Sequence, residues 1–249
     1  MNDFNQSTAE ALAKMAALEH RSVVRRSEST SLTPAQLAER SIIPYLDGAN
    51  RQLVDSFRDL RTRLLAISND NFITLVVPVS KGCGGSFVAR NLALSVTFDQ
   101  SKTALLIDCN LHSPSQHVSM KIDTARGGLV NYLEDPESEV DPMIYGTGIP
   151  RLKLIPAGKS TYGDVESEHF TSFRMRLLLD SLRSSYSDRY IFLDGPPALG
   201  SPDARILSEL ADVVVLVAGY GRNTPADIAA AAGSFDPRKF AGVVFNENA

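Results

Sequence analysis

Short apolar runs separated by segments of helix length constrain the fold of this chain more than any other feature. The runs lie at 72–78, 103–109, 152–157, 190–194, 213–218 and 241–246. Strands that are apolar throughout are buried on both faces, as in parallel sheets covered by helices. The helix-length segments between the runs include 86–98, 170–186 and 202–211. We therefore expect an α/β fold in which helices cover both faces of a mostly parallel sheet.

Composition excludes several other classes of protein. With 249 residues, 43% of them hydrophobic, the chain can bury one large core. Its net charge of −4 gives no basic field that would attract nucleic acid. No stretch approaches the roughly 18 apolar residues of a membrane span, and the polar start lacks the plan of a signal peptide. We expect a cytoplasmic protein without a nucleic-acid partner, in which Cys83 and Cys109 are reduced thiols.

The first 50 residues differ in composition from the rest of the chain. Residues 8–20 are predicted to form one short helix, and the Ser-, Thr-, Arg- and Pro-rich stretch that follows is typical of a linker. Residues 1–50 are therefore expected to form a flexible N-terminal tail, and residues 51–249 the folded domain. The domain is expected to begin with an amphipathic helix over 51–66, whose apolar stripe packs against it.

A glycine-rich loop, SKGCGGS, follows the first expected strand and leads directly into a helix. A phosphate loop has this context and the pattern G-x-x-x-x-G-K-[ST], in which the lysine contacts phosphates and the hydroxyl binds Mg²⁺. Gly84 and Ser86 fit the pattern, but Gly85 stands where the lysine belongs. The residues expected to contact a nucleotide are Lys81, Gly82, Cys83, Gly84, Gly85, Ser86 and Phe87.

Two other expected strands end in aspartate, Asp108 in LLIDCN and Asp194 in YIFLDGPP. Ligands of open α/β sheets bind beyond the carboxyl ends of the strands, so both carboxylates should lie near the glycine-rich loop. Together with Ser86 they are suited to hold Mg²⁺. An aspartate at a strand end is often only a helix cap or turn residue. The combination with the loop nevertheless indicates a nucleotide site.

These segments resemble the bacterial tyrosine kinases of capsule and exopolysaccharide synthesis, which share a Rossmann-like P-loop NTPase fold with the cell-division and partition ATPases. The likeness begins near residue 40. The family's acidic-x-x-Arg-x-x-Arg helix is matched by Asp55, Arg58 and Arg61, with Asp in place of the usual Glu. The other matching segments are GCGGSFVARNLALS, LLIDCNLHSP, GLVNYL, LKLIPAG, YIFLDGPPALGSPDARIL and AGVVFN.

The resemblance implies ATP or ADP and Mg²⁺ as cofactors. It implies catalytic roles for Asp108, Asn110 and Asp194, and metal contacts from Ser86, Asp108 and Asp194. It also implies a homo-oligomer, assembled through the helix that carries Asp55, Arg58 and Arg61. A transmembrane chain-length or export protein is the implied partner, so that the chain would reach the inner membrane only through that partner, from the cytoplasm.

Departures from the family pattern fall on its reactive groups. Gly85 replaces the lysine, Asn110 replaces the second aspartate of L-L-I-D-x-D-x-R-x-P, and His112 replaces its arginine. An asparagine brings no negative charge to a metal, and the missing lysine removes a cation from the place where charge develops.

The sequence therefore predicts a weak or inactive kinase, a pseudokinase, that keeps the geometry of a phosphate loop, so that Gly85→Lys should tighten nucleotide binding. One alternative is an active autokinase or ATPase in which Lys81 supplies the charge. A second alternative is a partition-type positioning ATPase.

Overall fold

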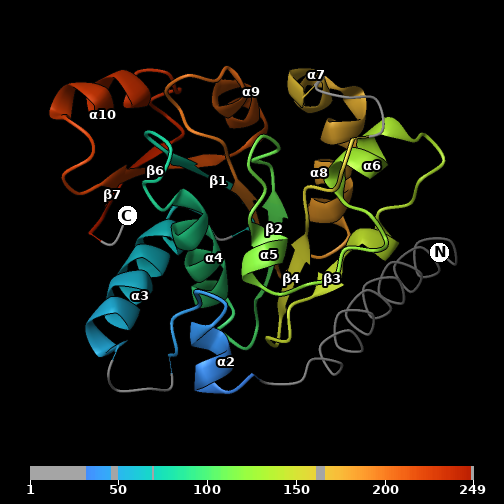
Figure 1. Cartoon of the computed structure of the whole chain (residues 1–249), viewed down its shortest axis with the longest axis horizontal. Helices are drawn as coiled ribbons and strands as arrows, with labels where there is room; N and C mark the ends of the chain where they lie inside the picture. The colour runs from blue at the N-terminus through green and yellow to red at the C-terminus, as the bar shows by residue number, and fades with distance from the viewer. Residues whose placement is uncertain (1–31, 46–49, 69, 161–165, 248–249) are drawn as a thin grey trace, which may run out of the picture.

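A seven-stranded sheet forms the centre of the computed structural model, which describes residues 32–45, 50–68, 70–160 and 166–247 (Figure 1). Its strand order is β3-β4-β2-β5-β1-β6-β7. The strands are β1 (Ile73–Pro78), β2 (Thr103–Asp108), β3 (Tyr145–Gly146), β4 (Leu152–Ile155), β5 (Arg189–Asp194), β6 (Val213–Gly219) and β7 (Phe240–Asn246). All neighbouring pairs are parallel except β3 with β4. The expected mostly parallel α/β sheet is confirmed, and only the short antiparallel β3 was not predicted.

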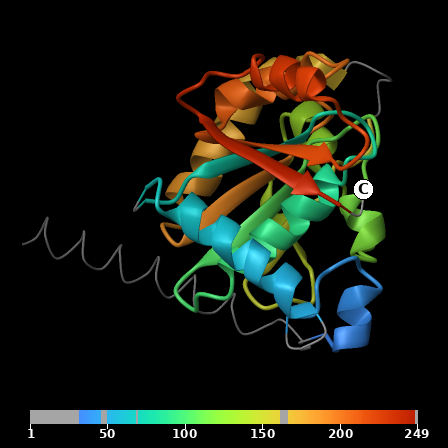
Figure 2. The same cartoon turned by 90° about the vertical axis from the view of Figure 1, so that its left-hand side faces the viewer.

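Helices cover both faces of the sheet, as Figures 1 and 2 show. They are α2 (Pro34–Ala38), α3 (Arg51–Leu65), α4 (Gly85–Val96), α5 (Gln116–Ser119), α6 (Leu129–Glu134), α7 (Glu166–Thr171), α8 (Phe173–Ser184), α9 (Asp203–Leu210) and α10 (Pro225–Ala232), with a 3-10 turn at Asp141–Met143. Alternate strand residues face opposite sides, so that Val76 packs with α3 and α4 while Leu75 and Val77 pack with α8 and α9. No helix in the described ranges is long and apolar enough to cross a membrane.

One predicted helix is in fact two. The segment 170–186 was expected to be continuous, but α7 ends at Thr171 and α8 starts at Phe173. Ser172 between them has extended backbone angles, and its hydroxyl accepts a hydrogen bond from the backbone N–H of Met175. This is the geometry of an N-cap, which starts a new helix.

Part of the expected N-terminal tail belongs to the folded domain. Helix α2 begins with a capping box between Thr33 and Gln36, and Leu37 and Ile42 are 3% and 2% exposed in the core beside α4. The backbone N–H of Ile43 donates to Asn91 Oδ1 at 2.9 Å. The predicted boundary at residue 50 is therefore wrong for 32–45, and the predicted helix at 8–20 lies outside the described residues.

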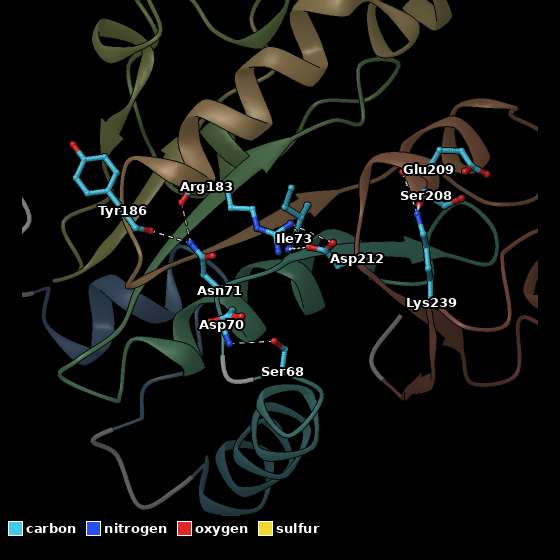
Figure 3. Close-up of polar contacts among 10 residues, drawn as sticks. All are labelled: Ser68, Asp70, Asn71, Ile73, Arg183, Tyr186, Ser208, Glu209, Asp212 and Lys239. Atoms are coloured by element: carbon cyan, nitrogen blue, oxygen red, sulfur yellow. Dashed lines mark hydrogen bonds and ion pairs between the residues drawn. The ribbon is translucent and has the colours of Figure 1, made fainter. Parts of the chain in front are cut away.

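Side-chain hydrogen bonds and an ion pair connect the segments at the amino ends of the strands (Figure 3). This edge of the sheet lies opposite the one that carries Asp108 and Asp194. Asp212 accepts the backbone N–H of Ile73 at 2.9 Å and pairs with Arg183 at 3.1 Å, which joins the starts of β1 and β6 to the end of α8. Asn71 donates to the carbonyls of Arg183 and Tyr186, both at 3.0 Å. This edge is fastened by polar contacts, whereas the carboxyl edge carries the glycine-rich loop.

Candidate functional site

The glycine-rich loop joins the end of β1 to the start of α4 at the carboxyl edge of the sheet (Figure 1). Gly82 and Gly84 have φ angles of +86° and +79°, a left-handed conformation that strains other residues. The first backbone N–H groups of a helix have no acceptor within it, and such a helix start binds phosphates. The loop therefore has the backbone form that the sequence predicts.

The ring of Pro78 lies against the position of a Cβ atom at residue 85, where the lysine is missing. A Cβ atom at Gly85 would lie 2.7 Å from Pro78 Cδ and 2.9 Å from Pro78 Cγ. These distances are too short for carbon atoms, so any side chain at position 85 forces the strand end or the helix start to move. A lysine at position 85 would therefore require a shift of the existing loop, which the sequence did not indicate. The glycine at position 85 and the proline at the end of β1 are therefore sterically matched to each other.

The side chain of Cys83 is bonded within the protein. Its side chain is buried, and its thiol donates to Asn223 Oδ1 at 3.0 Å and lies 3.3 Å from the hydroxyl of Ser80. Asn223 also donates to Ser80 Oγ at 2.8 Å and accepts the N–H of Gly219 at 3.0 Å. These bonds fasten the loop after β6 to the glycine-rich loop. Asn223 was not predicted, because nothing in its local sequence separates it from an ordinary turn residue.

Two exposed cations belong to this region. Lys81 is exposed within the glycine-rich loop, as the sequence indicates. Arg222, which was not predicted, comes from the loop that Asn223 fastens, and its Nη1 would lie 3.3 Å from a Cβ at Gly82. Arg222 is thus the guanidinium that the structure places over the loop backbone.

The two predicted aspartates lie side by side on neighbouring strands, in register with each other. Both are fully buried. Asp108 accepts backbone N–H groups from Ser115 and Gln116, each at 3.0 Å, and from Asn110 at 3.3 Å. The donors belong to the turn that leads from β2 into α5. Both oxygens of Asp108 are therefore committed to the protein backbone.

Burial raises the pKa of both carboxyl groups. Desolvation raises the pKa of Asp108 to about 6, although its three backbone hydrogen bonds act in the opposite direction. Desolvation, and then the charge of Asp108, raise the pKa of Asp194 to about 7, opposed by hydrogen bonds from Gln116 and Ser86. Two like charges at this spacing in a buried site disfavour joint ionisation.

Gln116 and Arg90 complete the polar cluster, and neither was predicted. Gln116 is fully buried, and its Nε2 donates to Asp194 Oδ2 at 2.6 Å and to the carbonyl of Ser86 at 3.0 Å. Its Oε1 accepts from Arg90 Nε at 2.9 Å. Burial lowers the pKa of Arg90 to about 10, which leaves it charged at neutral pH. The available signal was an arginine among the small and apolar residues of SFVARNLALSV.

Asn110 and His112 replace the aspartate and the arginine of the family's second acidic motif, and both make contacts at the carboxyl edge of the sheet. The backbone of Asn110 bonds to Asp108, and its side-chain oxygen is buried without a hydrogen-bond partner among the described residues. His112 Nε2 lies 3.3 Å from Asp203 Oδ2 at the start of α9. The position of the family's arginine therefore carries a contact with α9.

Most of the predicted magnesium ligands are engaged in hydrogen bonds within the protein. Both oxygens of Asp108 accept backbone N–H groups, and Ser86 and Gln116 both bond to Asp194. Within the described ranges, no three or more His, Cys, Asp or Glu side chains are grouped so that they could hold a metal ion. A hard cation requires several free oxygen ligands. Asp194 Oδ1 and Asn110 Oδ1 are buried without a hydrogen-bond partner among the described residues, whereas Gln116 would have to release Asp194 Oδ2 before that oxygen could bind a metal.

The charged helix expected to mediate self-association is α3. Asp55 pairs with Arg58 at 3.0 Å on the same helix, and both side chains are half exposed. Arg61 instead donates to the carbonyl of Ser95 on α4 at 3.0 Å. Asp55 and Arg58 remain accessible to another subunit, whereas Arg61 is engaged within its own chain. Self-association stays a prediction.

The chain is similar to several curated protein kinases, although no protein-family model matches it. It is 29% identical over 191 residues to the tyrosine-protein kinase ptk of Acinetobacter johnsonii, covering 75% of this chain and 25% of that protein. It is 32% identical over 178 residues to the putative tyrosine-protein kinase EpsB of Ralstonia solanacearum, covering 70% and 23%. The tyrosine-protein kinase CpsD of Streptococcus agalactiae is 28% identical over 169 residues, covering 67% and 70%. The chain thus spans only 25% and 23% of the first two relatives.

Solved structures give the same relationship. The kinase domain of the Escherichia coli tyrosine kinase ETK matches with a TM-score of 0.73 at 24% identity, covering 90% of this chain and 84% of that one. The BceF tyrosine kinase domain matches with a TM-score of 0.66 at 28% identity, covering 79% and 78%. The cell division ATPase MinD of Pyrococcus furiosus shares the fold with a TM-score of 0.55 at 21% identity, covering 70% of each chain. The predicted family resemblance and the P-loop fold are confirmed.

Proposed function

Because the chain belongs to the bacterial tyrosine kinases of the P-loop fold, we propose that it is a kinase-like member with weak or no phosphotransfer activity. Its role is to regulate capsule or exopolysaccharide synthesis through binding, as a pseudokinase. The relatives from Ralstonia and Streptococcus, which this chain matches over 178 and 169 residues, are a putative tyrosine-protein kinase and a tyrosine-protein kinase. In this proposal the chain has the fold of these kinases but lacks their phosphotransfer activity.

The observation that carries this proposal is the contact between position 85 and Pro78. Phosphoryl transfer depends on positioning and on cations that stabilise the charge developing at the phosphates. The ring of Pro78 excludes a side chain from the lysine position. Asn110 brings no charge in place of the second aspartate, and Asp108 already accepts three backbone N–H groups. Each change weakens the same step.

Weak phosphate binding is compatible with what remains. The left-handed glycines and the start of α4 keep their backbone form, and Arg222 lies beside Gly82. We therefore propose that ADP or ATP binds weakly at this loop, through backbone N–H groups and exposed cations. A transmembrane chain-length or export protein is the proposed partner, met at the cytoplasmic side of the inner membrane.

An active autokinase or ATPase is the enzyme alternative, favoured by the exposed position of Lys81 on the same loop. Its ammonium would have to replace the lysine that Pro78 excludes. A positioning ATPase of the partition type is a second alternative, since MinD has the same fold. The higher TM-scores of the tyrosine kinase domains, 0.73 and 0.66 against 0.55, favour the kinase-like reading.

Incubation of the full chain with Mg-ATP, followed by detection of phosphotyrosine, tests the proposal. The kinase domain of an active relative serves as the positive control under the same conditions. We expect no phosphotyrosine on this chain. A signal that grows with time and disappears in Lys81→Ala would support the enzyme alternative instead.

A further inference from the structure

Arg90 is a charged residue in the middle of a buried helix. Its side chain is 2% exposed, and an unpaired buried charge is strongly unfavourable. Its guanidinium donates hydrogen bonds to neutral acceptors: Gln116 Oε1 at 2.9 Å, and the carbonyls of Arg40 at 2.7 Å and Ser41 at 3.3 Å. The charges of Asp194 and Asp108 raise the pKa of Arg90 against the effect of burial, so these carboxylates are the negative groups that act on it.

Gln116 stands between Arg90 and those carboxylates. Its side-chain oxygen accepts from Arg90, its side-chain nitrogen donates to Asp194 Oδ2 at 2.6 Å, and its backbone N–H donates to Asp108 Oδ2 at 3.0 Å. The orientation of the amide is fixed, because only the nitrogen can donate and only the oxygen can accept. The chain Arg90–Gln116–Asp194 is therefore polarised in one direction, from cation to anion.

We propose that Arg90 is the resident counter-cation of the Asp108–Asp194 pair, and that Gln116 relays its charge while occupying Asp194 Oδ2, one of the oxygens that a divalent cation could use. The site is therefore metal-independent. This inference deepens the proposed function and rests on it in treating the site as a modified P-loop site. In this account Arg90 and Gln116 are positioning residues.

The same contacts explain why the segment before α3 belongs to the domain. Arg90 Nη1 holds the carbonyls of Arg40 and Ser41, and the neighbouring Asn91 donates to Ser41 O at 3.1 Å. A purely structural role for Arg90 would end there. The role of counter-cation predicts a further effect, because removal of Arg90 should leave two carboxylates that attract a metal ion.

Metal alone is the probe, in the absence of nucleotide. Thermal unfolding of the full wild-type chain is measured in EDTA, in Mg²⁺ and in Mn²⁺ at constant ionic strength, and Mn²⁺ binding is followed by electron paramagnetic resonance. We expect the wild-type Tm to agree within about 1 °C in all three, a difference far below that of a bound ligand. We also expect no bound Mn²⁺.

Two variants remove the relay in different ways. Gln116→Glu keeps the shape of the side chain but places a third carboxylate beside Asp194, and Arg90→Met removes the charge but keeps much of the stem. Each should lower the Tm in EDTA by roughly 5–15 °C, as loss of a buried charge partner does. Mn²⁺ should restore part of that loss in both. Gln100→Glu on an exposed turn is the matched control and should show neither effect.

The result that overturns the inference is metal binding by the wild type, seen as a Tm rise of several degrees and as bound Mn²⁺ that Asp194→Asn abolishes. Folded variants that respond to Mn²⁺ no more than the wild type would also overturn it. If neither variant folds, the wild-type resonance measurement decides alone. The phosphotyrosine assay tests the proposed function, and the metal-binding measurements test the role of Arg90 and Gln116. The failure of one is therefore distinguishable from the failure of the other.

Discussion

The ring of Pro78 occupies the space into which a side chain at position 85 would extend, with only 2.7 Å between Pro78 Cδ and the Cβ that such a side chain would carry. The last residue of β1 and the first residue of α4 are therefore matched to each other. A glycine at position 85 is required by its neighbour. We therefore expect that a lysine introduced at position 85 alone strains the loop.

Gly85→Lys alone is predicted to lower the free energy of unfolding by about 1–3 kcal/mol, as overpacking does, without tightening ATP binding. Pro78→Gly combined with Gly85→Lys should relieve the clash and bind ATP more tightly than the wild type, because the ammonium then reaches the phosphates. Calorimetric titration of ATP checks this, with Pro78→Gly as the control. A gain from Gly85→Lys alone would contradict the packing argument.

Arg222 is predicted to contribute more than Lys81 to the weak binding of ADP. Arg222→Ala should weaken binding roughly tenfold, the effect of about 1.4 kcal/mol, because its guanidinium lies over Gly82. Lys81→Ala should have a smaller effect. Arg238, which is 89% exposed and pairs with Asp236, provides the control Arg238→Ala. Fluorescent ADP displacement measures all three, and a larger loss in Lys81→Ala would favour the enzyme alternative.

The buried carboxyl groups predict that the protein becomes less stable as the pH rises from about 4 to about 7. The folded protein has raised pKa values for Asp108 and Asp194, about 6 and about 7, against an ordinary value of 3.8. The folded state therefore binds more protons than the unfolded state in this window, and each extra proton costs about 1.4 kcal/mol of stability per pH unit.

Urea unfolding between pH 4 and pH 8 measures this dependence. Asp194→Asn should flatten the decline, since the amide does not titrate and relieves the repulsion from Asp108. The exposed Asp70→Asn is a control and should leave the slope unchanged. An unchanged slope in a folded Asp194→Asn protein would show that the pair does not titrate in this range.

Substitutions of the charged residues of α3 are predicted to have different effects for the pair Asp55 and Arg58 than for Arg61. Asp55→Ala with Arg58→Ala removes a half-exposed pair and should reduce the particle mass measured by light scattering, if α3 joins subunits. Arg61→Ala breaks the bond to Ser95 and should lower the free energy of unfolding by about 1–2 kcal/mol. Identical masses for the wild type and the double variant would count against assembly through this helix.

Much of the fold follows from local sequence. Apolar runs predict the strands, and the glycine-rich turn and the aspartates at strand ends predict the edge on which the site lies, because parallel strands present their carboxyl ends together. The break at Ser172 was not predicted, because the capping serine lies within a continuous apolar pattern. Segment 32–45 was assigned to the tail, since its few apolar residues reveal their burial only against α4.

The features that distinguish this site could not be predicted, because they are contacts between distant residues. Arg90 and Gln116 are 26 residues apart, and Gln116 and Asp194 are 78 residues apart. Cys83 and Asn223 are 140 residues apart. The sequence indicates which groups are missing from the family pattern, whereas only the fold shows which residues occupy their places.

The most direct test of the central claim is a single-turnover measurement with a trace of γ-labelled Mg-ATP and the full chain in large excess. An excess of protein drives even weak binding, so the experiment reports chemistry rather than affinity. We predict that the label stays on ATP, with no transfer to tyrosine or to water above the protein-free control. Transfer at a rate comparable with that of an active kinase domain measured in parallel would contradict the account.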